Sequence, residues 1–178
     1  MSDSIILWSE DSSVEGFVHV VGAVKEMLNF AMINGVPLRG AVSCGELSFY
    51  DNSHGSKYTQ SSLVGEGLVN AYEVENAQLW SGCAVDVETL LSKCSDQKEK
   101  INQAIEYLIQ SGILVKYNIP CKKDHKNYTI AINWTKEDAV DEEWIRSSFA
   151  EHNKKIKDEK VETMIENTVE FYKKMRGV

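Results

Sequence analysis

The chain has 178 residues, of which 43% are hydrophobic and 26% charged, and its formal net charge at neutral pH is -8. This composition predicts one globular domain with a hydrophobic core, and the acidic balance excludes a duplex-binding surface, which needs clustered Lys and Arg. Because the sequence shows no signal peptide and no uninterrupted apolar run of about 18 residues, we expect a cytoplasmic protein without a membrane anchor.

The chain opens with an expected short strand over residues 4–8, preceded by Asp3. A helix is expected from about Ser13 to Asn34, because apolar residues recur there at helical spacing. Ser12 or Ser13 can cap the first turn, and Gly35 can end the helix. We expect this helix to cover one face of a sheet.

Residues 38–45 predict a strand, in which Arg39 places a cation within a mostly apolar element. A polar turn follows, and the chain returns over residues 58–64, so we expect these two strands to form a hairpin. Arg39 needs an acceptor there, such as Glu46 or another strand carboxylate. A second helix is expected to begin near Glu66.

The remainder of the chain alternates strand and helix signals, followed by a helical tail. Amphipathic periodicity predicts a helix over residues 98–110, ended by Gly112. Further elements are expected as a strand over 83–87, a helix over 88–94, strands over 114–120 and 128–134, and two helices within 138–178. An apolar stripe in the last helix must be buried, on this domain or on a partner chain.

The four cysteines lie far apart in the sequence and form no CxxC pair; they are Cys44, Cys83, Cys94 and Cys121. They fall in segments with strand-like or helix-like surroundings. We therefore expect buried, reduced thiols in place of a zinc site or disulfides.

Two stretches carry a resemblance to a known family. RGAVSCG at 39–45, followed by a hairpin and GEGLVNAYEVE at 65–75, resembles the second half of a class III nucleotidyl cyclase catalytic domain. The helix sequence LVNAYEVE is closer to the bacterial pyrimidine cyclases of the anti-phage Pycsar type than to ordinary adenylyl or guanylyl cyclases. The resemblance covers roughly the first half of the chain.

The resemblance implies an α+β fold, namely a ferredoxin-like nucleotidyl cyclase palm over residues 1–136 with a helical extension over 137–178. It implies conversion of a nucleoside triphosphate, UTP or CTP, to a 3',5'-cyclic nucleotide and pyrophosphate, as a signal in anti-phage defence. It also implies a homodimer with sites at the interface, Mg²⁺ or Mn²⁺ as cofactor, and no nucleic-acid or membrane partner.

The resemblance also implies site residues. Asp3 matches a metal-binding aspartate, and the alternative is a solvated terminal carboxylate. Arg39 matches a catalytic residue that grips the triphosphate. Ser62 stands where the family reads the base, Gly65 leads the helix whose start favours anions, and Asn70 lies one place beyond the family's ribose-binding asparagine.

Two departures from the family pattern weigh against catalysis. Glu73 replaces an arginine that would stabilise the transition state. The first metal aspartate and the triphosphate-cradling turn of the family would lie upstream of Asp3, and one carboxylate alone holds two metals poorly. Either the chain is an N-terminally shortened product, or the protein does not perform the chemistry alone. The alternative is therefore a catalytically inactive, cyclase-like binding or dimerisation module. A lysine among Lys122, Lys123 and Lys126 is expected to reach the triphosphate if the family pattern holds.

Overall fold

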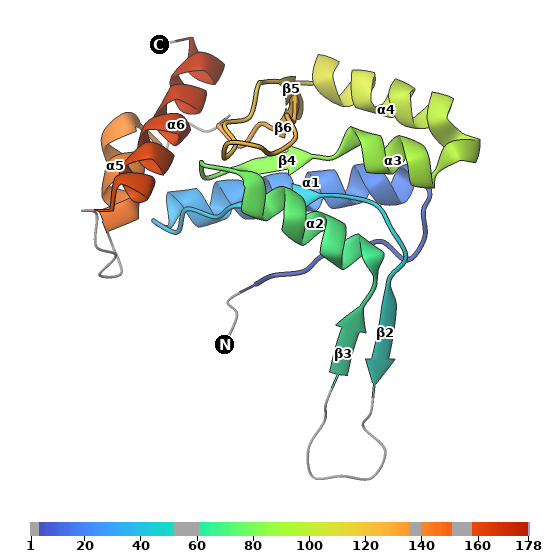
Figure 1. Ribbon diagram of the computed structural model, residues 1–178. Helices are drawn as coiled ribbons and strands as arrows, with labels where there is room; N and C mark the ends of the chain where they lie inside the picture. The colour runs from blue at the N-terminus through green and yellow to red at the C-terminus, as the bar shows by residue number, and fades with distance from the viewer. Residues whose placement is uncertain (1–3, 52–60, 136–139, 151–157, 178) are drawn as a thin grey trace.

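The computed structural model describes residues 4–51, 61–135, 140–150 and 158–177 (Figure 1). It has an α+β fold, as expected from the sequence, with helices around a mixed sheet. In chain order the elements are α1 (Val14–Ile33), β1 (Gly40–Val42), β2 (Ser48–Asp51), β3 (Ser61–Val64), α2 (Glu66–Ala77), β4 (Cys83–Val85), α3 (Val87–Lys93), the short 3₁₀ helix η1 (Ser95–Gln97), α4 (Lys98–Gln110), β5 (Leu114–Lys116), β6 (Ile130–Ile132), α5 (Glu142–Ala150) and α6 (Glu159–Arg176).

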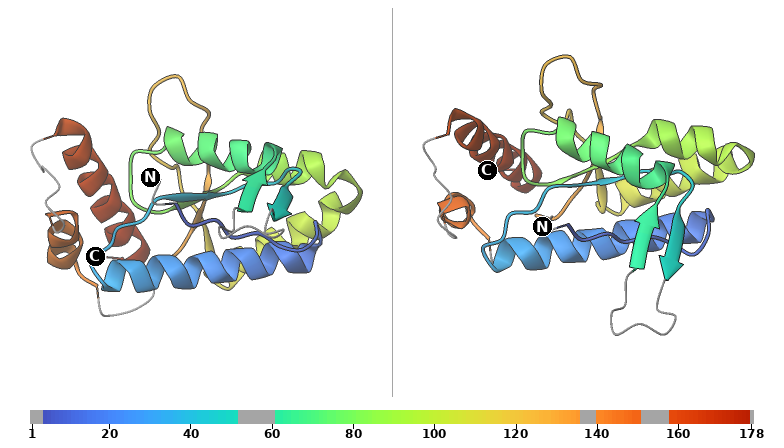
Figure 2. Two further views of the ribbon diagram at one scale, coloured as in Figure 1. Left: turned by 90° about the horizontal axis from the view of Figure 1, so that it is seen from below. Right: turned by 60° about the horizontal axis from the view of Figure 1, so that its bottom comes forward.

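The main sheet has four strands in the order β1-β4-β6-β5. β1 pairs with β4 in parallel, and the other two pairings are antiparallel. Every residue of β4 and of β6 is buried, which places these strands at the centre of the core. The helices α1 and α2 lie on opposite sides of β1 (Figure 2). Among the residues that the structure describes, β1 and β5 are the two edge strands of this sheet.

The helix α1 confirms the first helix expected from the sequence. The Ser13 side chain accepts a hydrogen bond from the Gly16 backbone N–H at 2.9 Å, and Gly35 follows the helix with a φ of 73°. By length and composition α1 could cross a membrane. Its apolar face, which includes Val21 and Leu28, is instead part of the core cluster. This arrangement is compatible with a soluble protein.

The expected hairpin between residues 38–45 and 58–64 is wrong in its first strand. β1 pairs with β4, and the hairpin consists of β2 and β3, which project from the body (Figure 1). The chain leaves β1 after Val42 and packs its backbone against α2, where a Cβ on Gly45 would lie 2.5 Å from the Gly67 nitrogen. This close approach interrupts the strand, because the backbone turns toward the helix and away from the sheet.

The expected strand over residues 4–8 is also wrong. Within the described structure this segment belongs to neither sheet, and its side chains from Ile5 to Trp8 are exposed. Trp8 stacks on Phe49 of β2, with ring centroids 6.2 Å apart. A run of four apolar residues, Ile5 to Trp8, forms a strand only if a neighbouring strand accepts its hydrogen bonds, and the sequence does not say whether one does.

The apolar stripe of α6 is buried on this domain. Phe171 contacts Trp80 and Tyr117, with ring centroids 4.7 Å and 4.9 Å apart. The Thr168 hydroxyl accepts a hydrogen bond from the Ser81 backbone N–H at 2.8 Å. The sequence left open whether this domain or a partner chain covers the stripe, and the structure shows it packed against the chain's own core.

Candidate functional site

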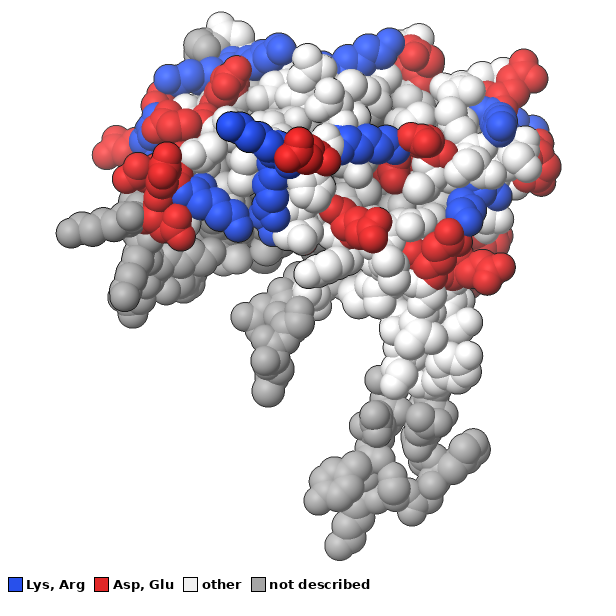
Figure 3. All heavy atoms as spheres, in the orientation of Figure 1, with Lys and Arg blue, Asp and Glu red and all other residues white. Residues whose placement is uncertain are grey.

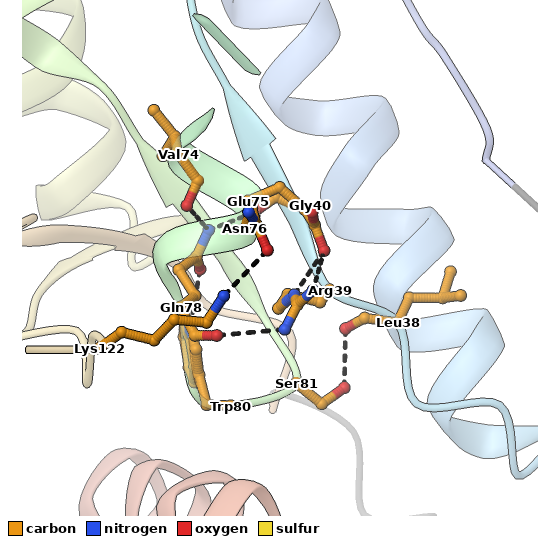
Figure 4. A network of polar contacts seen from close by, with 10 residues as sticks. All are labelled: Leu38, Arg39, Gly40, Val74, Glu75, Asn76, Gln78, Trp80, Ser81 and Lys122. Carbon is orange, nitrogen blue, oxygen red and sulfur yellow. Dashed lines mark hydrogen bonds and ion pairs between the residues drawn. The ribbon is translucent and has the colours of Figure 1, made fainter. Parts of the chain in front are cut away.

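Arg39 precedes β1 and points toward the end of α2. Its guanidinium forms an ion pair with Glu75 through Nε and Nη2, and Nη1 donates to the Gln78 carbonyl at 3.1 Å (Figure 4). The Arg39 and Glu75 side chains are 21% and 27% exposed. The acceptor is therefore a helix carboxylate, and not the strand carboxylate Glu46 that the sequence suggested.

Gln78 lies at the centre of the same network and is fully buried. Its Nε2 donates to the Gly40 carbonyl at 2.9 Å and to the Val74 carbonyl at 3.0 Å. Its Oε1 accepts from the Trp80 indole N–H at 2.7 Å. The Gln78 side chain thus joins the end of α2 to β1 and to the aromatic core. These hydrogen bonds hold the backbone around Arg39 in place.

Lys122 lies at the rim of this network. Its Nζ donates to the Asn76 side-chain oxygen at 2.9 Å (Figure 4). Of the three lysines considered from the sequence, Lys122 is the one shown at the same end of α2 as Arg39. Lys126 instead forms ion pairs with Asp86 and Glu88. Two cationic side chains, Arg39 and Lys122, therefore lie against the end of α2, near the carboxylate of Glu75.

The other candidate residues lie on β3 and on the first half of α2 with its cap. Asn70 donates from Nδ2 to the Cys44 carbonyl at 3.1 Å. Gly65 has a φ of 151°, and a Cβ there would lie 2.2 Å from the Glu46 carbonyl oxygen. The chain's own backbone thus explains why this position requires glycine. Ser62 is half-buried on β3 and faces Tyr50 across the hairpin.

The structure separates these candidates into two groups. Glu75, which binds Arg39, and Asn70 are five residues apart on α2, a rise of roughly 7.5 Å along the helix axis. On the other side of the contact, Arg39 and Cys44 are five residues apart, a stretch that spans at most about 17 Å. Arg39 and Asn70 therefore lie at opposite ends of the contact between β1 and α2.

The metal site expected around Asp3 lies outside the described residues. Within the described part of the chain, no group of three or more His, Cys, Asp or Glu side chains is arranged to hold a metal ion. Glu73, which stands in place of the family's arginine, is exposed on α2.

A pocket of about 480 Å³ opens elsewhere, between the end of β4, α3 and the loop that precedes β6. Asp86 lies on its wall with its side chain only 6% exposed, and Lys126 binds this carboxylate at 3.1 Å. Burial lowers the pKa of Lys126, but its hydrogen bonds with Glu88 and Asp86 outweigh that effect and raise the pKa above its ordinary value. Sequence reasoning missed this pocket, although a polar residue directly after a buried strand was a usable signal.

Neither this pocket nor a second one beside β5 is lined by Arg39, Ser62, Gly65 or Asn70.

Comparisons of the chain with protein-family models, with curated proteins and with solved structures found no match.

Proposed function

We propose that this chain forms part of a pyrimidine-type nucleotidyl cyclase in the cytoplasm, with a ferredoxin-like palm. It would convert UTP or CTP to a 3',5'-cyclic nucleotide and pyrophosphate for anti-phage signalling. The observation that carries the proposal is the pairing of the resemblance with the position of two cations. Arg39, directly before β1, and Lys122 both lie at the end of the glycine-led helix α2.

In the proposed reaction the ribose 3'-oxygen forms a bond to the α-phosphorus and loses its proton, while the bond to the β-phosphate oxygen breaks. Arg39 and Lys122 would hold the phosphate oxygens of the departing pyrophosphate, whose negative charge grows as that bond breaks. The contacts to Glu75 and Gln78 do not exhaust the N–H donors of Arg39. The activity would require Mg²⁺ or Mn²⁺, for which Asp3 is the ligand that the resemblance names.

The separation of the two residue groups supports a homodimer. Because Arg39 and Asn70 lie at opposite ends of the β1–α2 contact, we propose that each nucleotide contacts Arg39 of one copy and Asn70 of the other. Exposed apolar side chains are available for such an interface, namely Phe49 and Tyr50 on the hairpin and Val69 and Tyr72 on α2. Charged side chains of both signs cover the body, while the described part of the hairpin is uncharged on the face shown (Figure 3).

A second candidate function is nucleotide binding or dimerisation without catalysis. It is favoured by the ion pair between Arg39 and Glu75, because a carboxylate already occupies the cation that should grip phosphate. Glu73 favours it too, since a negative charge would oppose the developing charge of the transition state.

The test is incubation of the chain with each of the four nucleoside triphosphates and Mg²⁺ or Mn²⁺, with cyclic product and pyrophosphate measured separately. We expect product from UTP or CTP, and we expect its loss in Asp3→Ala and Arg39→Met. Lys123→Met is the matched control, because Lys123 is exposed and lies next to Lys122 in the sequence.

A binding measurement with the same triphosphates separates the two candidates. Binding of a triphosphate without formation of cyclic product would overturn the cyclase and support a nucleotide-binding module without catalysis. Absence of binding to all four triphosphates would overturn both the cyclase and the nucleotide-binding module, and would leave dimerisation alone.

A further inference from the structure

Two cysteines that are 50 positions apart in the sequence meet in the fold. Cys44 follows β1, Cys94 ends α3, and their sulfur atoms are 3.5 Å apart. A disulfide bond is about 2.0 Å long, so the two sulfurs need to approach by about 1.5 Å to be joined. Rotation about the side-chain bonds and a small shift of the segment after β1 can supply such a displacement.

We propose that Cys44 and Cys94 form a reversible disulfide, which makes this pair a thiol-oxidation site. The co-reactant is a low-molecular-weight disulfide such as oxidised glutathione. One protein thiolate attacks a glutathione sulfur, which forms a mixed disulfide and releases one glutathione thiolate. The second protein thiol then attacks the protein sulfur of that mixed disulfide and releases the second glutathione. The two cysteine protons end on the two released thiols.

The environments of the two thiols set the order of these steps. Cys44 is half-buried, whereas Cys94 is only 5% exposed, so glutathione reaches Cys44 first and Cys94 resolves the mixed disulfide. Burial, followed by the contact with Cys94, raises the pKa of Cys44 to about 11. Since the thiolate is the nucleophile, we expect oxidation to be slow at neutral pH and to accelerate as the pH rises toward that value.

Closure of this disulfide would act on the neighbouring contacts of Cys44. The Cys44 backbone N–H donates to the Thr89 hydroxyl at 3.3 Å, and its carbonyl accepts from Asn70 at 3.1 Å. A shift of Cys44 toward α3 therefore displaces an anchor of α2. This inference does not depend on cyclase activity, because it rests on the two sulfurs and their surroundings alone.

The test is a thiol count. The reduced chain is incubated with oxidised glutathione at mildly alkaline pH, quenched with acid, denatured, alkylated and weighed intact. We expect the four alkylated cysteines of the reduced chain to fall to two, with a peptide map that links Cys44 to Cys94 and a reductant that restores the full count.

Single variants test the order of the steps. Cys94→Ser should stop at a stable glutathione adduct on Cys44, and Cys44→Ser should form no internal disulfide. Cys121→Ser is the matched control, because it should lose two thiols as the unsubstituted chain does. Retention of all four thiols by the unsubstituted chain, a persistent adduct on its Cys44, or a link through Cys121 would each overturn the proposal. The peptide map of the unsubstituted chain decides the matter even if a variant fails to fold.

Discussion

The ion pair between Arg39 and Glu75 allows a quantitative test by a double-mutant cycle. Arg39→Met removes the guanidinium and leaves the Glu75 carboxylate without its partner; Glu75→Gln removes the opposite charge. Each side chain is about three-quarters buried. Hydrogen bonds to charged groups contribute about 1.5–3 kcal/mol, and partial solvent screening reduces that value. We therefore expect each single substitution to lower the free energy of unfolding by about 2 kcal/mol.

The double variant should lose less than the sum of the single variants, with a coupling free energy of about 1 kcal/mol. Urea unfolding followed by tryptophan fluorescence measures all four members of the cycle. Lys116 and Glu106 form the matched control pair, because their side chains are 68% and 56% exposed, and exposed pairs contribute between about 0 and 1 kcal/mol. Additive effects at Arg39 and Glu75, within about 0.3 kcal/mol, would refute the argument that these charges stabilise each other.

The same variant bears on function, since Glu75→Gln removes the carboxylate that competes for Arg39. If Arg39 binds phosphate, this substitution should tighten triphosphate binding while it destabilises the fold. Opposite changes in affinity and stability would not arise from a purely structural ion pair. A fall in both would favour the structural role of Arg39.

Two further predictions concern backbone geometry and pH. Gly65→Ala should lower the free energy of unfolding by about 2 kcal/mol or more, because the φ of Gly65 is 151° and the new Cβ would clash with the backbone. Gly22→Ala should instead raise the free energy of unfolding by about 0.5–1 kcal/mol, because nothing lies within 4 Å of a Cβ at that position. Equal urea midpoints for the two variants would contradict this prediction. Hydrogen bonds from Lys173 and then Arg146 lower the pKa of Glu142 below 4.5. The unsubstituted chain should therefore be more thermally stable than Glu142→Gln above pH 4.5, and this difference should disappear as the pH falls through the lowered pKa of Glu142. A difference in thermal stability that persists in acid would contradict this prediction.

The sequence by itself determined the helices of this protein and the segments that contain its buried strands. The periodicity that predicted residues 98–110 reappears as α4, and Ser13 and Gly35 bound α1 as expected. These features were predictable because side-chain spacing, caps and left-handed glycines act over a few neighbouring residues. The resemblance implied the α+β class, and the helices and mixed sheet of the structure agree with it.

Only the tertiary structure decided which segments meet. It paired β1 with β4, gave Arg39 a helix carboxylate as its acceptor, buried the stripe of α6 on the chain's own core, and brought Cys44 and Cys94 together. Such contacts join positions that are tens of residues apart, and many alternative partners satisfy the same local pattern. The choice among them depends on how the whole chain buries its apolar surface, which no short stretch of sequence encodes.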